Sequence, residues 1–351
     1  MRIVVNDIAA SHGGAITILK DFYKSIIESG DKNEWIFILS DMYIDETENI
    51  KVLLREDIKK SWLKRALFDV KYGSEYIEKL NPDIVISLQN TLIKNLNIPQ
   101  IVYIHQAIPF QKVKHFSFLK KEERIYAIYQ YIIGRLIKNS AKIANLVVVQ
   151  TNWMKDALIN DLLIDLNKIE VIRPSVKKID WNMECSDEKI NFFYPAEKDI
   201  YKNHECIFEA INLLKSRDGR KFNVDLTIDS YKGHKEDEVN YLGRIKRDEV
   251  IDRMSKSILV FPSYIETLGL PLIEAMELNR IILVADCEYS REVLQGYSNV
   301  YYFDPFKSNE LADLMGKIIN GDIHRDQCKI LNAKKYKSWN DLIKIINNKQ
   351  W

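Results

Sequence analysis

Short apolar runs alternate with amphipathic helical stretches along the chain, and this alternation restricts the possible folds more than any other feature. The runs are rich in β-branched and aromatic residues, and in the first half of the chain they lie at 3–5, 35–39, 83–88, 100–105 and 146–150. After a proline-broken segment the pattern restarts, with runs at 190–194, 224–228, 257–261, 281–285 and 300–303. Strands that alternate with helices favour parallel sheets that are covered on both faces. The sequence therefore predicts an α/β protein with two doubly wound, parallel sheets.

The length of the chain also requires more than one core. At 351 residues it is too long for one ordinary core and long enough for two α/β domains of similar size. We expect an N-terminal domain at 1–172 and a C-terminal domain at 173–335, with the boundary near Pro174. The terminal segment 336–351 fits a helix that crosses back onto the first domain, and Trp339 is expected to pack between the domains.

The composition is that of a globular protein with almost no net charge. The 51 Lys and Arg residues are balanced by 50 Asp and Glu residues, so nucleic acid is not an expected partner. The four cysteines are scattered, which indicates reduced thiols and neither a disulfide frame nor a zinc site. Met1 leads directly into the first apolar run, and no run approaches transmembrane length. We therefore expect a cytoplasmic protein.

The segment 257–276, SILVFPSYIETLGLPLIEAM, carries the densest set of candidate site residues. A strand ends at Pro262 and a helix begins near Pro271, with a loop that carries Glu266 between them. A helix start at the carboxyl end of a parallel sheet offers unpaired backbone amides to an anion. Glu274 is expected in the first helical turn, where the helix dipole alone favours a carboxylate by roughly 0.3–1 kcal/mol. Glu266 by itself would be an ordinary solvated loop residue.

At three further sites, glycines or polar side chains lie at the ends of the predicted strands and helices. Gly13 and Gly14 lie at a strand-to-helix turn, where they allow a ligand to approach the backbone or simply form a tight turn. His105 ends an apolar run, and a lone histidine in such a place is more often structural. Lys202 lies directly before a helix that Asn203 is expected to cap. A cation there opposes the helix dipole unless an anion lies between them, so Lys202 is a candidate phosphate ligand.

The two glutamates around the run GLPLIEAM lie eight positions apart and resemble the donor-site motif of retaining GT-B glycosyltransferases, family 4-like. This large group includes sucrose synthases and bacterial mannosyltransferases. The segment VYIHQAIPF at 102–110 looks like the family's H-Q-x-x-P-F segment, and YKNH at 201–204 is similar to the pattern around its diphosphate-binding lysine. The resemblance implies two Rossmann-like domains that face each other across a cleft. The first domain would lie on the acceptor side, and the second would bind the nucleotide-sugar donor.

The resemblance also implies roles for the candidate side chains. Glu266 would be catalytic and face the reacting carbon of the donor sugar, and His105 would be catalytic on the opposite wall. Glu274 would hold the ribose hydroxyls, and Lys202 would hold the diphosphate. The family usually pairs this lysine with an arginine six residues earlier, but this position holds an alanine here, and Lys198 is the candidate substitute.

Loop backbone groups complete the expected donor site. One loop contains Ile245, near which the nucleotide base would be read, and a second contains Thr267, Leu268 and Gly269. The third is the segment His12-Gly13-Gly14, which falls where the family has a loop over the cleft.

The resemblance implies a retaining hexosyltransferase that moves a sugar from a UDP- or GDP-type donor to a saccharide acceptor. The acceptor would be lipid-linked, in the synthesis of a surface polysaccharide of capsule or O-antigen type. The sequence contains no Asp-x-Asp motif, so we expect no metal and no other cofactor, with the leaving diphosphate stabilised by amides and by lysine. Two alternatives stay open, namely a nucleotide-sugar epimerase on a similar scaffold and a homologue that binds nucleotide sugars without turnover.

The segment 110–139 combines aromatic residues with a local excess of lysine. Such a segment suits the anionic surface of a membrane, and we expect the protein to be peripheral on the inner face of the plasma membrane if this interpretation holds. A lid that packs on the cleft, with a solvated charged face, explains the same pattern equally well.

Overall fold

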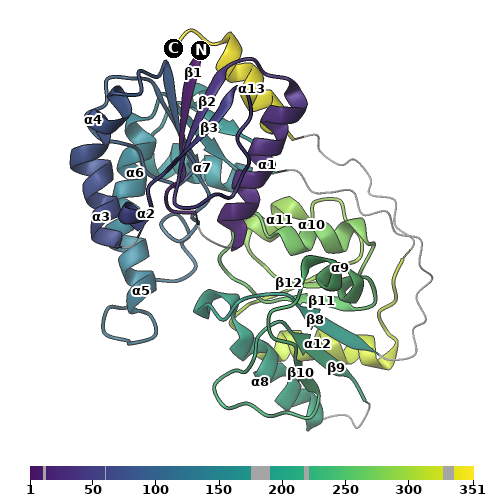
Figure 1. Ribbon diagram of the computed structural model, residues 1–351. Coiled ribbons are helices and arrows are strands. Elements are labelled where there is room, and N and C mark those ends of the chain that lie inside the picture. Colours follow the sequence, from purple (N-terminus) through teal and green to yellow (C-terminus); the bar gives the residue numbers. More distant parts are fainter. Residues whose placement is uncertain (11–12, 60, 175–189, 217–220, 327–335) are drawn as a thin grey trace. The chain divides into compact units, whose positions relative to one another are not determined.

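The computed structural model describes residues 1–10, 13–59, 61–174, 190–216, 221–326 and 336–351 (Figure 1). The chain divides into two compact units. Unit 1 comprises Met1–Ser175 together with Lys335–Trp351, and unit 2 comprises Val176–Lys334. Each unit is built on its own parallel sheet, which confirms the expected α/β class with two doubly wound sheets.

The described residues of unit 1 form a seven-stranded parallel sheet with the strand order β3-β2-β1-β4-β5-β6-β7. In chain order the strands are β1 (Arg2–Asn6), β2 (Glu34–Leu39), β3 (Ile50–Leu54), β4 (Ile84–Ser87), β5 (Gln100–Ile104), β6 (Leu146–Val149) and β7 (Ile169–Val171). The sequence analysis did not identify β3. This strand lies at the edge of the sheet and is only half buried, so it lacks the continuous apolar run of the inner strands.

Helices cover both faces of this sheet (Figure 1). They are α1 (Gly13–Ser29), α2 (Glu56–Lys59), α3 (Trp62–Leu67), α4 (Gly73–Glu78), α5 (Arg124–Ala127), α6 (Gly134–Ile143), α7 (Asn152–Leu162) and α13 (Trp339–Asn348), with π-helical turns η1 (Phe68–Tyr72) and η2 (Ile128–Ile133) and the 3₁₀ turn η3 (Leu166–Lys168). Alternate side chains of β1 enter different cores: Ile3 and Val5 pack with α1 and α13, whereas Val4 packs with α2 and α4.

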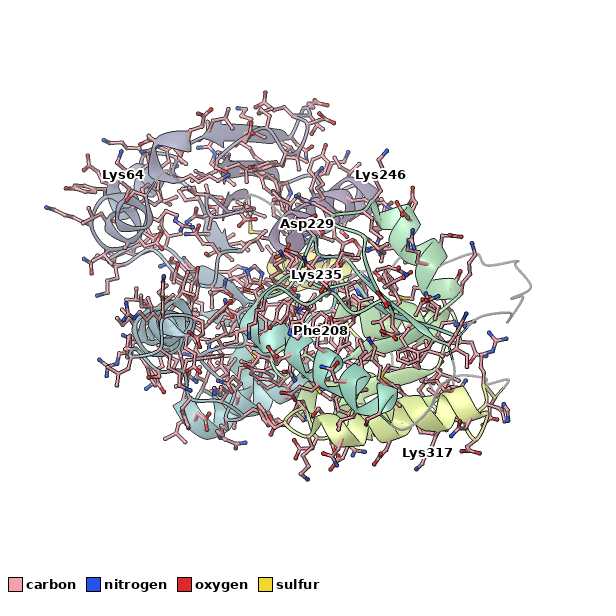
Figure 2. The ribbon with its side chains drawn as sticks, turned by 90° about the horizontal axis from the view of Figure 1, so that it is seen from below. Lys64, Phe208, Asp229, Lys235, Lys246 and Lys317 are labelled. Carbon is pink, nitrogen blue, oxygen red and sulfur yellow. The ribbon has the colours of Figure 1, made fainter. Side chains whose placement is uncertain are left out.

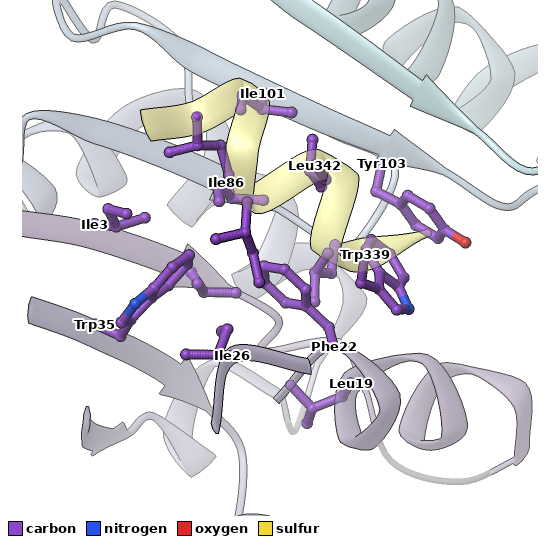
Figure 3. Close-up of a cluster of buried hydrophobic side chains, with 14 of the residues drawn as sticks. Ile3, Leu19, Phe22, Ile26, Trp35, Ile86, Ile101, Tyr103, Trp339 and Leu342 are labelled. Atoms are coloured by element: carbon purple, nitrogen blue, oxygen red, sulfur yellow. The ribbon is translucent and has the colours of Figure 1, made fainter. Parts of the chain in front are cut away.

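Trp339, in the first turn of α13, is one of the largest fully buried side chains of unit 1 (Figure 3). The centre of its ring lies 5.0 Å from that of Phe22 and 4.9 Å from that of Tyr103. Its indole Nε1 donates a hydrogen bond of 2.8 Å to Asp21 Oδ2. Trp339 is therefore a core residue of unit 1, which corrects the expectation that it packs between domains.

The described residues of unit 2 form a six-stranded parallel sheet with the order β10-β9-β8-β11-β12-β13. Its strands are β8 (Asn191–Tyr194), β9 (Asn223–Leu226), β10 (Val239–Tyr241), β11 (Ile258–Phe261), β12 (Ile282–Ala285) and β13 (Val300–Phe303). Its helices are α8 (His204–Lys215), α9 (Arg247–Ser255), α10 (Leu270–Glu277), α11 (Glu288–Val293) and α12 (Ser308–Asn320), and η4 (Ile200–Lys202) is a 3₁₀ turn. Phe208 of α8 stacks on Tyr231 and His234, which holds the loop after β9 against this helix. Figure 2 labels Phe208 together with Asp229 and Lys235, two residues of the same loop.

Each sheet reverses its strand order at one point. In unit 1 the reversal lies between β1 and β4, and in unit 2 it lies between β8 and β11. At such a point the two neighbouring strands lead into connections that depart in opposite directions, which leaves a crevice at their carboxyl ends where ligands bind in open α/β sheets.

Candidate active site

Glu266 lies in the loop after β11, at the strand reversal of unit 2. The buried hydroxyl of Ser263 donates a hydrogen bond of 2.8 Å to Glu266 Oε1. Ser263 is itself held by the hydroxyl of Tyr289, which donates to the Ser263 carbonyl at 2.5 Å. These contacts give the carboxylate a defined position in a segment that the sequence describes only as a polar loop.

Lys202 meets Glu266 directly. Its ammonium Nζ lies 2.5 Å from Glu266 Oε1, and the two side chains are 19% and 14% exposed. The lysine ends η4 after β8, and its carbonyl accepts a hydrogen bond of 2.8 Å from the hydroxyl of Tyr194. Since β8 and β11 are neighbours at the strand reversal, two residues that are 64 positions apart in the chain form one ion pair at this edge of the sheet.

Asn203 does not cap α8 with its side chain as expected. It adopts a left-handed conformation, with φ of 58°, and its side-chain amide makes no cap hydrogen bond. The amide Nδ2 donates instead to the carbonyls of Pro305 at 2.7 Å and Pro262 at 3.3 Å. Asn203 thus ties the loop that carries Lys202 to the loops after β11 and β13, and this contact supports the position of the ion pair.

The helix α10 begins after Gly269, which has a φ of +73°. A side chain at this left-handed residue would be strained, and its Cβ would lie 3.2 Å from Leu272 Cδ1. Glu274 is the fifth residue of this helix, which corrects its expected place in the first turn. The dipole argument for a carboxylate at a helix start therefore does not explain Glu274.

Glu274 is buried and bonded to Arg247, a residue that the sequence analysis missed. Arg247 Nη2 lies 2.6 Å from Glu274 Oε1, and the arginine side chain is 55% exposed. Burial raises the pKa of the Glu274 carboxyl, and the guanidinium of Arg247 lowers it in part. Arg247 is the first residue of α9, so the argument that singled out Lys202, a cation at a helix start, also identifies Arg247.

The other expected donor residues of unit 2 lie in loops that follow strands of the same sheet. Lys198 is exposed, and its Nζ lies 3.4 Å from Ser230 Oγ. Ile245 is half buried in the loop between β10 and Arg247. The side chain of Leu268 is buried, so only its backbone can reach a ligand, whereas Thr267 is half buried.

His105 lies in unit 1, directly after β5. Its backbone amide donates a hydrogen bond of 2.7 Å to Asn90 Oδ1, and its ring Nδ1 is buried with no hydrogen-bond partner among the described residues. Burial lowers the pKa of this imidazole to about 4, so the ring is neutral at neutral pH. His105 lines a pocket of about 270 Å³ at the strand reversal between β1 and β4.

Gly13 and Gly14 form the start of α1, and His12 lies outside the described residues. Gly13 has a φ of +61°, which favours glycine. A Cβ on Gly14 would meet no atom within 4 Å, so the fold itself does not require glycine there. The next residue, Ala15, contributes to the pocket that contains His105.

Two carboxyl groups in the same pocket were missed by the sequence analysis. Asp7, directly after β1, is 2% exposed, and burial raises its pKa to about 8. Asp69 in η1 has a pKa that burial raises to about 7, against the opposing effects of Thr91, Arg65 and Gln89. The position of Asp7 at a strand end is a signal that the sequence contains, but nothing in the sequence connects Asp69 to this edge of the sheet.

The structure thus assembles two groups of candidate residues. In unit 2, Lys202 pairs with Glu266 and Arg247 pairs with Glu274, and in unit 1 His105 shares a pocket with Asp7 and Asp69. Within the described ranges, no cluster of three or more His, Cys, Asp or Glu residues is suited to hold a metal ion. None of the helices among the described residues has both the length and the apolar character that a membrane span requires.

Comparison with known proteins finds a family match in unit 2 and a structural similarity that spans both units. Residues 176–336 match the family model "Glycosyl transferases group 1", and no curated protein matches the chain. Similar solved structures include the lipopolysaccharide outer core galactosyltransferase WaaB in its apo form, with 18% identity, coverage of 92% of both chains and a TM-score of 0.63. HepE from Anabaena in complex with UDP-glucose is 15% identical over 92% of this chain and 90% of that chain, with a TM-score of 0.63.

A third structure, sucrose-phosphate synthase from Thermosynechococcus elongatus, is 14% identical over 91% of this chain and 90% of that chain, with a TM-score of 0.67. These similarities span both units and agree in fold with the two parallel sheets described above. The family match covers the segment with the Lys202–Glu266 and Arg247–Glu274 pairs. The chain therefore shares the GT-B fold with these structures, and its residues 176–336, somewhat less than half of the chain, match the glycosyl transferases group 1 model.

Proposed function

We propose that the protein is a retaining hexosyltransferase that moves a sugar from a nucleoside diphosphate to a saccharide acceptor without a metal ion. The observation that carries this proposal is the Lys202–Glu266 ion pair at the strand reversal of unit 2, next to the start of α10. A lysine and a helix N-terminus together provide the positive potential that a diphosphate requires, and the carboxylate beside them is available to the sugar.

In this proposal, different residues bind the diphosphate, the sugar ring and the ribose of the donor. The diphosphate accepts hydrogen bonds from the Lys202 ammonium and from backbone amides of Thr267, Leu268 and Gly269. As the bond between the anomeric carbon and the diphosphate oxygen breaks, negative charge grows on that oxygen, and these donors stabilise it. The acceptor oxygen attacks the same face of the sugar and passes its proton to the leaving diphosphate, while Glu266 and His105 stabilise the positively charged ring.

Glu274 accepts hydrogen bonds from the ribose hydroxyls, and Arg247 contacts the same carboxylate. Because both units are related in fold to HepE, which was solved with UDP-glucose, we propose a UDP-type donor ahead of a GDP-type donor. The nucleotide sugar is a substrate here, and Lys198 and the backbone near Ile245 complete its site.

A panel of nucleotide sugars tests this function. A donor at 100 times its dissociation constant should stabilise the protein by about 2.7 kcal/mol, which appears as a rise in the melting temperature. The donor found in this way should then release UDP or GDP only when a saccharide acceptor is added. Interconversion of the free nucleotide sugar would instead indicate an epimerase, and binding without turnover would indicate a protein that only binds nucleotide sugars.

Removal of Arg247 is expected to make nucleotide binding depend on pH. Without the guanidinium, burial alone shifts the pKa of the Glu274 carboxyl, so this pKa is higher than in the wild-type protein. The carboxyl therefore binds a proton at a higher pH. A protonated carboxyl accepts fewer hydrogen bonds from ribose, so the affinity of Arg247→Ala for UDP should fall as the pH falls, by up to about tenfold per pH unit. Calorimetric titration between pH 6 and 8.5 measures this effect.

Lys256→Ala is the matched control for Arg247→Ala, because it removes an exposed ion pair, with Asp252, from the other end of α9. Its UDP affinity should follow the same pH profile as the wild-type protein. If Arg247→Ala also keeps the wild-type profile, Arg247 does not adjust the protonation of Glu274.

We further propose that the acceptor is lipid-linked and that the protein acts at the inner face of the plasma membrane in the synthesis of a capsule or O-antigen type of polysaccharide. The name of WaaB, a lipopolysaccharide galactosyltransferase, supports an acceptor of this class. The surface of segment 110–139 supports membrane contact. Phe110 and Phe116 are buried, but the segment exposes a set of large apolar side chains, namely Val113, Phe118, Leu119, Ile125, Ile128, Tyr131 and Ile132.

The basic residues of this segment are partly engaged within unit 1. Lys112 pairs with Asp161 at 2.9 Å, and Lys114 and Lys120 both approach Glu123, at 3.4 and 3.5 Å. Charge reversal at these lysines would therefore disturb the fold as well as any membrane contact. Leu119 is 89% exposed, and Phe118 is also exposed, so substitutions there remove apolar surface without breaking an ion pair.

The double variant Phe118→Ser/Leu119→Ser is expected to bind anionic vesicles several-fold more weakly than the wild-type protein, because it loses the side chains that would enter the lipid. Wild-type binding should also weaken at high salt, since the remaining attraction is electrostatic. Co-sedimentation with phosphatidylglycerol vesicles measures both effects, and Leu166→Ser, an exposed leucine of η3, is the matched control. Wild-type protein that ignores these vesicles at low salt would refute membrane contact through this segment.

A further inference from the structure

The carboxylate of Glu266 is held through only one of its two oxygens. Glu266 Oε1 accepts hydrogen bonds from Lys202 Nζ at 2.5 Å and from Ser263 Oγ at 2.8 Å. No hydrogen bond from a described residue reaches the other oxygen, Oε2. The protein therefore fixes the carboxylate through Oε1 and leaves the hydrogen-bonding capacity of Oε2 to a ligand.

The two donors to Glu266 differ in what else they do in the proposed reaction. The Lys202 ammonium also binds the diphosphate of the donor, so the diphosphate competes with Glu266 for the same cation. Ser263 is fully buried, so neither substrate can reach its hydroxyl. A hydroxyl is also uncharged, and it orients the carboxylate without neutralising the negative charge that stabilises the sugar ring. Ser263 is therefore the partner that can hold Glu266 in place while the donor is bound.

The hydroxyl of Ser263 has one proton to donate, and its shortest contact as a donor is the one to Glu266. The carbonyl oxygens of Tyr201 and Ile265 lie farther from Ser263 Oγ, at 3.3 and 3.4 Å. An ionised carboxylate is also a stronger acceptor than a backbone carbonyl. Distance and charge thus both direct the proton of Ser263 to Glu266.

Tyr289, in α11, fixes the backbone of Ser263. Its buried phenol donates a hydrogen bond of 2.5 Å to the Ser263 carbonyl. The centre of its ring lies 6.4 Å from that of Phe261, the last residue of β11. Its Cε2 lies 3.5 Å from the place that a Cβ on Gly269 would occupy, directly before α10. Tyr289 therefore contacts both ends and the middle of the loop that carries Glu266.

The helix that carries Tyr289 is itself anchored to the sheet. The hydroxyl of Ser290, which is fully buried, donates to the carbonyl of Ala285 at 2.6 Å and accepts from the amide of Cys287 at 3.1 Å. Ala285 is the last residue of β12, and β12 lies beside β11 in the sheet. A continuous set of buried hydrogen bonds thus connects the central strands of unit 2 with the carboxylate of Glu266.

We propose that Ser263 and Tyr289 are positioning residues for the transfer: Ser263 fixes the Glu266 carboxylate through Oε1, and Tyr289 fixes Ser263 through its carbonyl. This inference rests on the proposed function, because it requires Glu266 to act on the donor sugar. Neither residue contacts a substrate, and both affect the reaction only through Glu266. A displacement of about 1 Å at a reacting group can slow a reaction by about 10²-fold, so the loss of either contact should reduce turnover.

Ser263→Ala is expected to lower kcat by about 10- to 100-fold, since it removes a hydrogen bond to a charged group. Tyr289→Phe keeps the ring in the core and removes only the hydroxyl, so kcat should fall by roughly three- to tenfold, as for a hydrogen bond between neutral groups. The KM for the donor and the affinity for UDP should not change, because Lys202 and the start of α10 remain. Release of UDP from the donor identified with the nucleotide-sugar panel measures kcat and KM, and calorimetric titration measures UDP binding.

A double-variant cycle separates positioning from a general loss of structure. In the Glu266→Gln protein the charge that Ser263 orients is absent, so the addition of Ser263→Ala should lower kcat by no more than about twofold. Ser257→Ala is the matched control, because it removes another buried hydroxyl at the opposite end of β11, where Ser257 Oγ accepts from Asn191 Nδ2 at 2.8 Å. This control should lower the melting temperature but leave kcat unchanged.

The outcomes distinguish this inference from the proposed function. If Glu266→Gln is slow but Ser263→Ala and Tyr289→Phe keep the wild-type kcat, the positioning role is wrong and the proposed function stands. The same holds if Ser263→Ala lowers kcat as much in the Glu266→Gln protein as in the wild-type protein. If Glu266→Gln itself keeps near wild-type turnover, the catalytic role of Glu266 fails, and the positioning role fails with it. Should Ser263→Ala not fold, as judged by circular dichroism, Tyr289→Phe takes its place in the cycle with the same expected loss of effect.

Discussion

Glu266→Gln is expected to lower kcat by about 10²-fold or more, with only a modest change in KM. In the proposed reaction the carboxylate stabilises positive charge that develops on the sugar ring, and this interaction strengthens in the transition state. The carboxylate of Glu266 has a defined position, because Ser263 and Lys202 both donate hydrogen bonds to its Oε1. The amide of glutamine preserves the size and one acceptor oxygen but removes the charge, so binding of the donor should survive.

Steady-state kinetics with the nucleotide-sugar donor measures this effect, with folding checked by circular dichroism. Glu277→Gln, at the exposed end of α10, is the matched control and should behave as the wild-type protein does. His105→Ala should resemble Glu266→Gln, whereas Glu274→Gln should mainly raise KM, because ribose contacts are present equally in the ground and transition states. Near wild-type turnover in Glu266→Gln would show that the carboxylate belongs to a nucleotide-binding site only.

Lys202→Ala is expected to weaken the binding of UDP by about 1.5–3 kcal/mol, the contribution of a charge-assisted hydrogen bond. The ion pair adds a second effect, because the variant leaves the Glu266 carboxylate without its cation and close to the incoming diphosphate. Glu266→Gln should therefore restore part of the lost affinity when it is combined with Lys202→Ala. Calorimetric titration of the two single variants and the double variant measures this coupling.

Lys235→Ala, at an exposed lysine of unit 2, is the matched control and should bind UDP with wild-type affinity. A Lys202→Ala variant with unchanged UDP affinity would remove this lysine from the donor site. Additive effects in the double variant would indicate that the Lys202–Glu266 ion pair does not influence nucleotide binding.

The sequence by itself determined the class of fold and the position of most strands. The inner strands are covered on both faces, so each appears in the sequence as a continuous apolar run, as at β5 and β12. The edge strand β3 escaped prediction because one of its faces is open to solvent, which removes that pattern. The candidate donor residues Glu266, Gly269 and Glu274 could also be grouped from the sequence, because all three lie within one strand–loop–helix unit.

Only the tertiary structure decided how these residues are paired. Lys202 and Glu266 meet because β8 and β11 are adjacent in the sheet, and Arg247 meets Glu274 because α9 lies beside α10. Asp69 reaches the pocket of unit 1 only through a π turn in a helix that is remote in sequence from β1 and β5.

The physical reason for this division is the range of the interactions involved. Local propensity and burial determine secondary structure within a few residues, and these leave a pattern in the sequence. The protonation of Asp7, the pairing of Lys202 and the burial of Trp339 depend on contacts between residues that are distant in the chain. Such contacts exist only after the sheets have formed and brought the carboxyl ends of neighbouring strands together.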